Sequence, residues 1–193
     1  MKRRTVAVVL VVGVLAVAVA GAAVLSQRQR TGGPLAGGDE AMIVVDAFEA
    51  GSLVTYGLQN LTNSGPDEIT VRDVKVLVGS PPVVLIDDDV MAYGPSRLVG
   101  SDSNLFDVRA GWPPGGDAVP AIGATIAPND RIGLELLIGV RVPSVDEGIG
   151  TLEGVTVRYT AGGREFVRTF HLTMTICPRG HVAKCDSLLA APR

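Results

Sequence analysis

The stretch Arg131–Val142, R-I-G-L-E-L-L-I-G-V-R-V, decides the fold class of this chain. Apolar side chains occupy every second position of it: Ile132, Leu134, Leu136, Ile138, Val140 and Val142. This period of two is typical of a β-strand with one face on a core and the other toward water, whereas a helix would scatter the same residues around its circumference. Turn-forming residues precede the stretch at Ala127–Asp130, and Pro143 ends it because proline cannot donate to a sheet ladder. We therefore predict a central strand in which Leu136 faces the core and Glu135 faces water.

Further apolar stretches on the N-terminal side of the central strand predict more strands. In chain order they are Ala41–Glu49, Leu53–Leu61, Ile69–Val78 and Val83–Ile86. Within the third stretch the alternation changes phase near Arg72 and Asp73, which predicts either a β-bulge there or a strand that passes from one sheet to the other.

Two more alternating runs, Val155–Tyr159 and Phe166–Ile176, lie toward the C-terminus on either side of Gly162 and Gly163. A pair of glycines between such runs is typical of a tight hairpin turn, because both can adopt a positive φ. About seven to nine short strands with turns between them predict an all-β fold, namely an antiparallel β-sandwich.

Two segments carry a resemblance to a known class of domain. Tyr56–Val74 (Y-G-L-Q-N-L-T-N-S-G-P-D-E-I-T-V-R-D-V) and Ile126–Ile132 (I-A-P-N-D-R-I) resemble the immunoglobulin-like domains of exported, membrane-anchored bacterial proteins. In those domains a strand ending in Asn-x-Gly leads into a second strand, and a Pro-containing turn leads into a central one. The resemblance implies an immunoglobulin-like sandwich used for adhesion, scaffolding or as an accessory module. It supplies no catalytic residues, and the Cys…Trp…Cys spacing of antibody domains is absent.

The N-terminus has the pattern of an export signal. Three basic residues, Lys2–Arg4, precede twenty uncharged and mostly apolar residues, Val6–Leu25. At about 1.5 Å per residue this stretch spans the roughly 30 Å hydrocarbon core of a bilayer. We predict a transmembrane signal anchor at residues 1–25 with a cytoplasmic N-terminus. A cleaved signal peptide is the alternative, because small residues at 18–22 offer cleavage sites; the protein would then be secreted.

The remaining chain divides by composition into three parts. Glycine and proline at residues 26–40 predict a flexible linker, 41–185 the extracytoplasmic sandwich, and 186–193 a C-terminal tail. Residues 31–193 carry 12 basic and 20 acidic groups, a net charge of −8. This charge argues against nucleic acid or an anionic membrane surface as a partner. The predominance of Arg over Lys, with abundant Ala, Val and Gly, suggests a bacterial source.

The only two cysteines, Cys177 and Cys185, lie close together near the C-terminus. In an exported domain such a pair is expected to form a disulfide. Because Cys177, His181 and Cys185 are spaced four residues apart, they also make a candidate zinc or copper site, with His171 as a more distant fourth ligand.

A long connection at residues 91–119 is rich in Gly, Pro, Ser and Asp and contains the sole tryptophan, Trp112. Long loops are often functional, so we predict a binding surface that includes Leu105, Phe106 and Trp112. The alternative is that Trp112 folds back to cover an open end of the sandwich.

Catalytic patterns are missing from the sequence. There is no G-x-S-x-G elbow, H-E-x-x-H helix or phosphate-binding glycine loop. We therefore expect a non-enzymatic protein without a cofactor, tethered to the membrane by its N-terminal helix, that binds or positions another envelope component such as a protein or polymer. The alternative is an extracytoplasmic metal-binding or metal-delivery protein that uses Cys177, His181 and Cys185.

Overall fold

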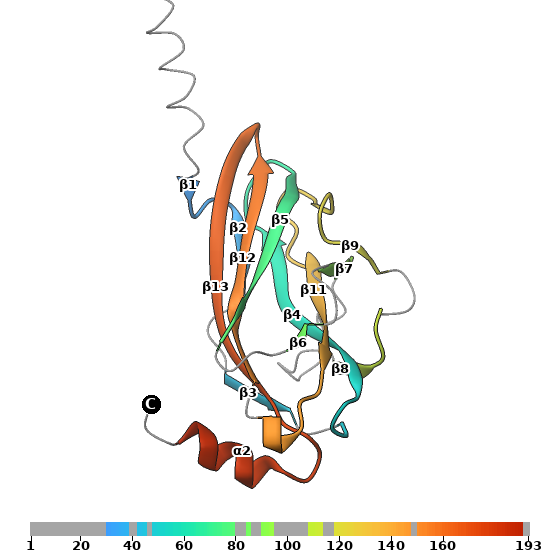
Figure 1. The fold of residues 1–193 in the computed structure, drawn as a ribbon. Coiled ribbons are helices and arrows are strands. Elements are labelled where there is room, and N and C mark those ends of the chain that lie inside the picture. The colour runs from blue at the N-terminus through green and yellow to red at the C-terminus, as the bar shows by residue number, and fades with distance from the viewer. Residues whose placement is uncertain are drawn as a thin grey trace, which may run out of the picture.

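Two β-sheets packed face to face form the body of the molecule (Figure 1). The computed structural model describes residues 30–38, 42–45, 48–79, 84–85, 90–94, 108–113, 118–147 and 150–190. The strands are β1 (Arg30–Thr31), β2 (Leu35–Gly37), β3 (Met42–Val45), β4 (Leu53–Asn63), β5 (Ile69–Val78), β6 (Val84–Leu85), β7 (Met91–Tyr93), β8 (Val108–Ala110), β9 (Val119–Pro120), β10 (Thr125–Ile126), β11 (Leu134–Arg141), β12 (Gly150–Ala161) and β13 (Arg164–Ile176). A 3₁₀ turn (Val145–Glu147) lies between β11 and β12, and the helix α2 (Val182–Leu189) follows β13. The predicted β-sandwich is confirmed.

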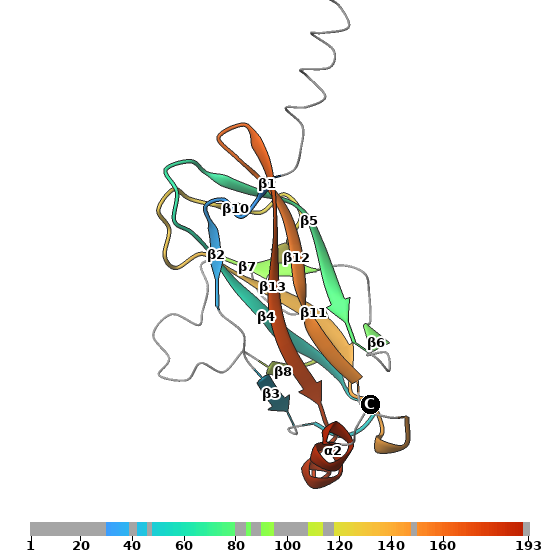
Figure 2. The same cartoon turned by 90° about the vertical axis from the view of Figure 1, so that its left-hand side faces the viewer.

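The two sheets divide the long strands between them. The first sheet has the order β1-β13-β12-β5-β10, and the second has the order β2-β4-β11-β7-β9. Short strands extend these sheets, since β3 pairs with β13, β6 with β11 and β8 with β4. The long strands are antiparallel to their neighbours, whereas the short strands β1 and β3 run parallel to β13. Figure 2 shows the same arrangement turned by 90°.

The predicted hairpin and the predicted bulge are both present. Gly162 and Gly163 form the turn between β12 and β13 with φ values of 53° and 70°. In the pairing of β12 with β5, Arg158 lies opposite Asp73 and the next residue, Tyr159, lies opposite Val71. Arg72 is therefore the extra residue that shifts the alternation of β5.

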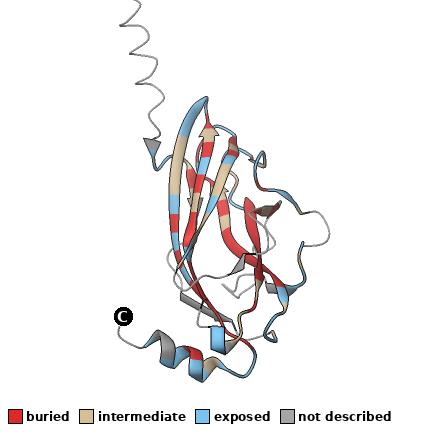
Figure 3. Ribbon diagram, viewed as in Figure 1, coloured by how far each residue is buried: buried red, intermediate tan, exposed pale blue. Residues whose placement is uncertain are grey.

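The central strand β11 is buried on both faces, so the prediction of one wet face is wrong. Leu136 is completely buried in the core as expected, but Glu135 on the other face is also completely buried. Figure 3 shows the burial along β11 as a whole. The segment after β8 covers part of that outer face: a Cβ on Gly139 would lie 2.6 Å from Cγ of Trp112. The alternation of a strand shows which of its side chains face the core. It does not show whether the outer face is covered, because the covering residue, here Trp112, lies about 25 residues away from Gly139 in sequence.

The central strand also begins later than predicted. Gly133 has a φ of 68° and turns the chain, so β11 starts at Leu134 and Ile132 remains 44% exposed instead of facing the core.

Part of the expected linker belongs to the sandwich. Leu35 in β2 is completely buried, and its N–H donates to the Tyr159 hydroxyl at 3.3 Å. The same hydroxyl donates to the Gly32 carbonyl at 2.6 Å, and Arg168 donates to the Leu35 carbonyl. Burial raises the pKa of Tyr159, although the Leu35 N–H and the Arg168 charge act in the opposite direction. The sandwich therefore includes β1 and β2 and does not begin at residue 41.

The expected membrane anchor, residues 1–25, lies outside the described residues. In the part of the chain that the structure describes, no helix is long and apolar enough to cross a membrane.

Gly133 and Gly163 provide a matched test of the turn before β11. Both have a positive φ, but an added Cβ would collide with the Leu61 carbonyl at Gly133 and would meet nothing within 4 Å at Gly163. We expect Gly163→Ala to lower the free energy of unfolding by roughly 1–2 kcal/mol. Gly133→Ala should cost at least about 2 kcal/mol more, because the backbone must also move. Urea denaturation measures both values, and equal losses would contradict the close approach of Gly133 to β4.

Candidate functional site

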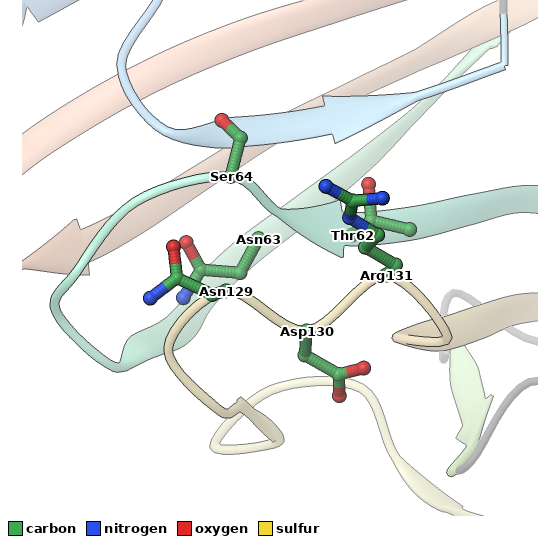
Figure 4. Close-up of a pocket in the computed structure, with 6 residues that line it drawn as sticks. All are labelled: Thr62, Asn63, Ser64, Asn129, Asp130 and Arg131. Carbon is green, nitrogen blue, oxygen red and sulfur yellow. The ribbon is translucent and has the colours of Figure 1, made fainter.

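A polar hollow lies at the end of the sandwich that carries the Gly162–Gly163 turn, which we call the hairpin end. Six residues line this hollow: Thr62, Asn63, Ser64, Asn129, Asp130 and Arg131 (Figure 4). They come from the last two residues of β4 and the turn that follows it, and from the turn after β10. The first turn lies against the hairpin, since a Cβ on Gly162 would contact the Asp67 carboxylate. Helix α2 lies at the other end of the molecule, which we call the disulfide end (Figure 1).

Asn63, the last residue of β4, fastens the two turns together. Its side chain is 1% exposed, and its amide nitrogen lies 2.8, 3.3 and 3.0 Å from the carbonyl oxygens of Asp67, Ile126 and Ala127. Its Oδ1 atom accepts the Gly65 N–H at 2.9 Å. A single buried amide thus satisfies backbone groups on both turns, which fixes the floor of the hollow.

The second turn is held by backbone and side-chain bonds. The Asn129 N–H donates to the Gly65 carbonyl at 2.9 Å, and the Asn63 N–H donates to the Asp130 carbonyl at 2.9 Å. Asn129 adopts a positive φ of 55°, a conformation that asparagine tolerates better than most residues. The Asp130 Oδ1 atom accepts the N–H groups of Ile132 at 2.8 Å and Gly133 at 3.1 Å. The hollow is therefore formed by backbone that is already ordered.

The hollow is small, open and polar. Its volume is about 220 Å³, below the roughly 300–1,000 Å³ of pockets that enclose a whole small molecule. Asn129 and Arg131 are exposed on its rim, and Thr62 and Asp130 are half-buried. The Ser64 hydroxyl donates to the Pro34 carbonyl at 2.9 Å. Such a space suits one polar unit of a larger molecule.

The side chains of the hollow suit hydrogen bonding better than covalent chemistry. Thr62 and Ser64 carry the only hydroxyls among the six lining residues, and neither histidine nor cysteine lines the space. The Asp130 carboxylate is directed away from both hydroxyls (Figure 4). Among the described residues that line the hollow, neither hydroxyl therefore has a neighbouring base that would activate it as a nucleophile.

The predicted binding residue Trp112 lies elsewhere in the fold. Its indole rests on Gly139 of β11 and is half-buried. The Thr55 hydroxyl donates to the Gly111 carbonyl at 2.7 Å and fixes the turn that presents the ring. Leu105 and Phe106, the other predicted binding residues, lie outside the described residues. Since β8 pairs with the first part of β4 and the hollow lies at its last residue, the structure does not bring Trp112 to the hollow.

The predicted disulfide is present between Cys177 and Cys185, whose Cα atoms are 6.3 Å apart. Both cysteines are buried, and the loop they close leads into α2. This loop is attached to two other connections. The Arg179 N–H donates to the Phe48 carbonyl at 2.8 Å, and Lys184 lies 3.6 Å from Asp146. A disulfide is typical of an extracytoplasmic domain.

The disulfide bears on the metal-site alternative. Because it engages both sulfur atoms, the Cys177, His181 and Cys185 ligand set exists only in the reduced protein. His181 is exposed at the start of α2, and His171 is exposed on β13. Within the described ranges, no group of three or more His, Cys, Asp or Glu side chains is placed to hold a metal ion.

The sequence analysis did not identify the hollow as a site. Its residues lie inside the two segments that resemble immunoglobulin-like domains, where Asn, Ser, Gly and Pro were interpreted as turn formers. The sequence offers one signal for this site, namely polar side chains such as Asn129 and Arg131 in its predicted turns. Only the fold shows that the two turns meet.

Comparison with known proteins leaves the chain without an assigned family: no protein-family model matches it, and no curated protein is significantly similar to it in sequence.

Asn63 and Asn129 separate the structural role of the hollow from its exposed chemistry. Asn63→Ala should lower the free energy of unfolding by about 2–4 kcal/mol, because it leaves four buried or part-buried backbone groups without this partner. Asn129→Gly should change it by less than about 0.5 kcal/mol, because the side chain is exposed and glycine tolerates a positive φ. Thermal and urea unfolding of both variants measure the difference. A mild effect of Asn63→Ala would contradict its role as the link between the turns.

The disulfide is expected to stabilise the disulfide end. Replacing both cysteines by serine should lower the free energy of unfolding by about 2.5 kcal/mol on the chain-entropy model for a loop of this length. Titration of the unfolded, unreduced wild-type protein should find no reactive thiol. Two reactive thiols in protein recovered from cells would show that the bond is not formed there.

Proposed function

We propose that this chain is a non-enzymatic, membrane-tethered extracytoplasmic β-sandwich of immunoglobulin-like architecture that binds or positions another component of the cell envelope. The disulfide supports the oxidising compartment, and the apolar Val6–Leu25 stretch supports the tether. Rigid strands that present side chains at their ends and on one face suit recognition rather than chemistry.

The tether would place the domain close to the membrane. The first described strand begins at Arg30, and Leu25 is the last residue of the apolar stretch. Five residue steps of at most about 3.6 Å reach no more than roughly 18 Å. Because β1 lies at the hairpin end, that end would face the bilayer and the disulfide end would point away from it (Figure 1).

The observation that carries the binding proposal is the seat of Trp112 on the central strand. Gly139 has no side chain, so the indole lies directly against β11. The bond from Thr55 to the Gly111 carbonyl holds the adjoining turn. A partly exposed aromatic ring on a fixed backbone loses little conformational entropy on binding, and such rings are frequent hot spots of interfaces.

Replacing Trp112 tests this surface. Trp112→Ala should weaken partner capture by on the order of 1–3 kcal/mol while the melting temperature stays within a few degrees. Capture is measured in intact cells with a photo-cross-linking residue placed at position 112, and at Ile122 as a control. Ile122 suits this purpose because it is 62% exposed and does not belong to the proposed surface.

The opposite outcome has a clear meaning. If Trp112 serves only to cover β11, Trp112→Ala should lower the melting temperature sharply, and capture should fall only as the fold is lost. Equal cross-linking from positions 112 and 122 would likewise overturn the proposed surface.

A further inference from the structure

We propose that the polar hollow at the hairpin end binds a neutral, hydroxyl-rich unit, one sugar ring of an envelope polysaccharide. This inference deepens the proposed function, since it names a ligand class for a sandwich that binds an envelope component. The hollow differs from the Trp112 surface in position and in chemistry, and it is carried by its own observations.

The first observation is the mixture of donors and acceptors around the hollow. Arg131 offers N–H donors, Asn129 offers both an N–H₂ donor and a carbonyl acceptor, and Thr62 offers a hydroxyl (Figure 4). Within the described part of the chain, no hydrogen bond or ion pair occupies these three side chains. A sugar hydroxyl both donates and accepts, so neighbouring hydroxyls on one ring match such a set.

The second observation is the charge of the hollow, which separates a neutral ligand from an ion. Arg131 and Asp130 are adjacent, and residues 31–193 have a net charge of −8. An anion would gain the attraction of one guanidinium but would meet the negative potential of the domain. A Ca²⁺ ion needs six to eight oxygen ligands and would find one carboxylate beside a positive charge. A neutral polyol avoids both costs.

The third observation is that the hollow is ordered before any ligand arrives. The buried Asn63 amide and the Asn129-to-Gly65 bond fix both turns, so binding does not have to order a loop. Its volume of about 220 Å³ accommodates one ring and not a chain. Because the hollow is open and none of its six described lining residues is aromatic, we expect binding in the millimolar range for a short saccharide, strengthened by repetition along a polymer.

The test uses the full chain, labelled with ¹⁵N and held in a detergent whose headgroup contains no sugar. Cellotriose, chitotriose and mannotriose are titrated separately, with inorganic phosphate as a charged comparison at constant ionic strength. We expect saturable amide shifts for at least one trisaccharide, confined to residues 62–64 and 129–131 and their strand neighbours.

Three variants sharpen the test. Asn129→Gly keeps the positive φ and removes the amide, Thr62→Val keeps the β-branched shape and removes the hydroxyl, and Arg131→Gln removes the charge. Asn129→Gly and Arg131→Gln should each weaken trisaccharide binding at least fivefold, and Thr62→Val at least twofold, with unchanged melting temperatures. Arg164→Gln is the control, because Arg164 is exposed at the same end but does not line the hollow; it should leave binding intact.

Several results would overturn the inference. These are the absence of saturable shifts at the hollow with all three trisaccharides, an equal loss of binding in Arg164→Gln, or saturation by phosphate alone. The last result would identify an anion site. In each case cross-linking through position 112 still reports independently on the proposed function.

Discussion

The burial of both faces of β11 is the constraint on which the rest of the structure depends. Its inner face packs against the other sheet through Leu136, Ile138 and Val140. Its outer face contains Glu135, Leu137 and Gly139, and these are also buried. A strand in this position cannot be an edge of the sandwich, so its neighbours β4 and β7 are fixed on its two sides. The ring of Trp112 lies against the outer face at Gly139, where the absence of a side chain leaves room for it.

The two ends of the sandwich are closed by different kinds of interaction. At the disulfide end, a covalent bond between Cys177 and Cys185 holds the loop before α2. At the hairpin end, the Asn63 side chain holds two turns through hydrogen bonds to backbone groups. The first closure leaves no free thiol for other chemistry. The closure at the hairpin end needs only the side chain of Asn63, which is buried. The exposed side chains of both turns remain available for binding, and the candidate site therefore lies at this end.

Sequence patterns predicted those features that depend on neighbouring residues. The alternation of β11, the extra residue at Arg72 and the Gly162–Gly163 turn are local, and all three were predicted correctly. The cysteine pair was predictable because its loop is short and the chain has the pattern of an exported protein. Features that join distant segments were not predictable. Trp112 comes from a distant segment and covers the outer face of β11 at Gly139, and the hollow exists because residues 62–64 and 129–131 meet in space. Residues 30–38 were mistaken for a linker because glycine and proline conceal the one buried side chain, Leu35, that holds them in the fold.

The geometry of β4 determines how the two candidate surfaces relate to each other. Thr55 anchors the turn of Trp112 near the start of this strand, and Asn63 supports the hollow at its end. Eight residues of strand separate them, which corresponds to roughly 25 Å. At this distance a single small ligand cannot contact both surfaces. Mutations at sites this far apart usually change stability additively, within about 0.5 kcal/mol. If the tether holds the hairpin end toward the bilayer, the hollow faces material at the membrane surface and Trp112 faces partners farther out, so one rigid strand would set the spacing between two independent contacts.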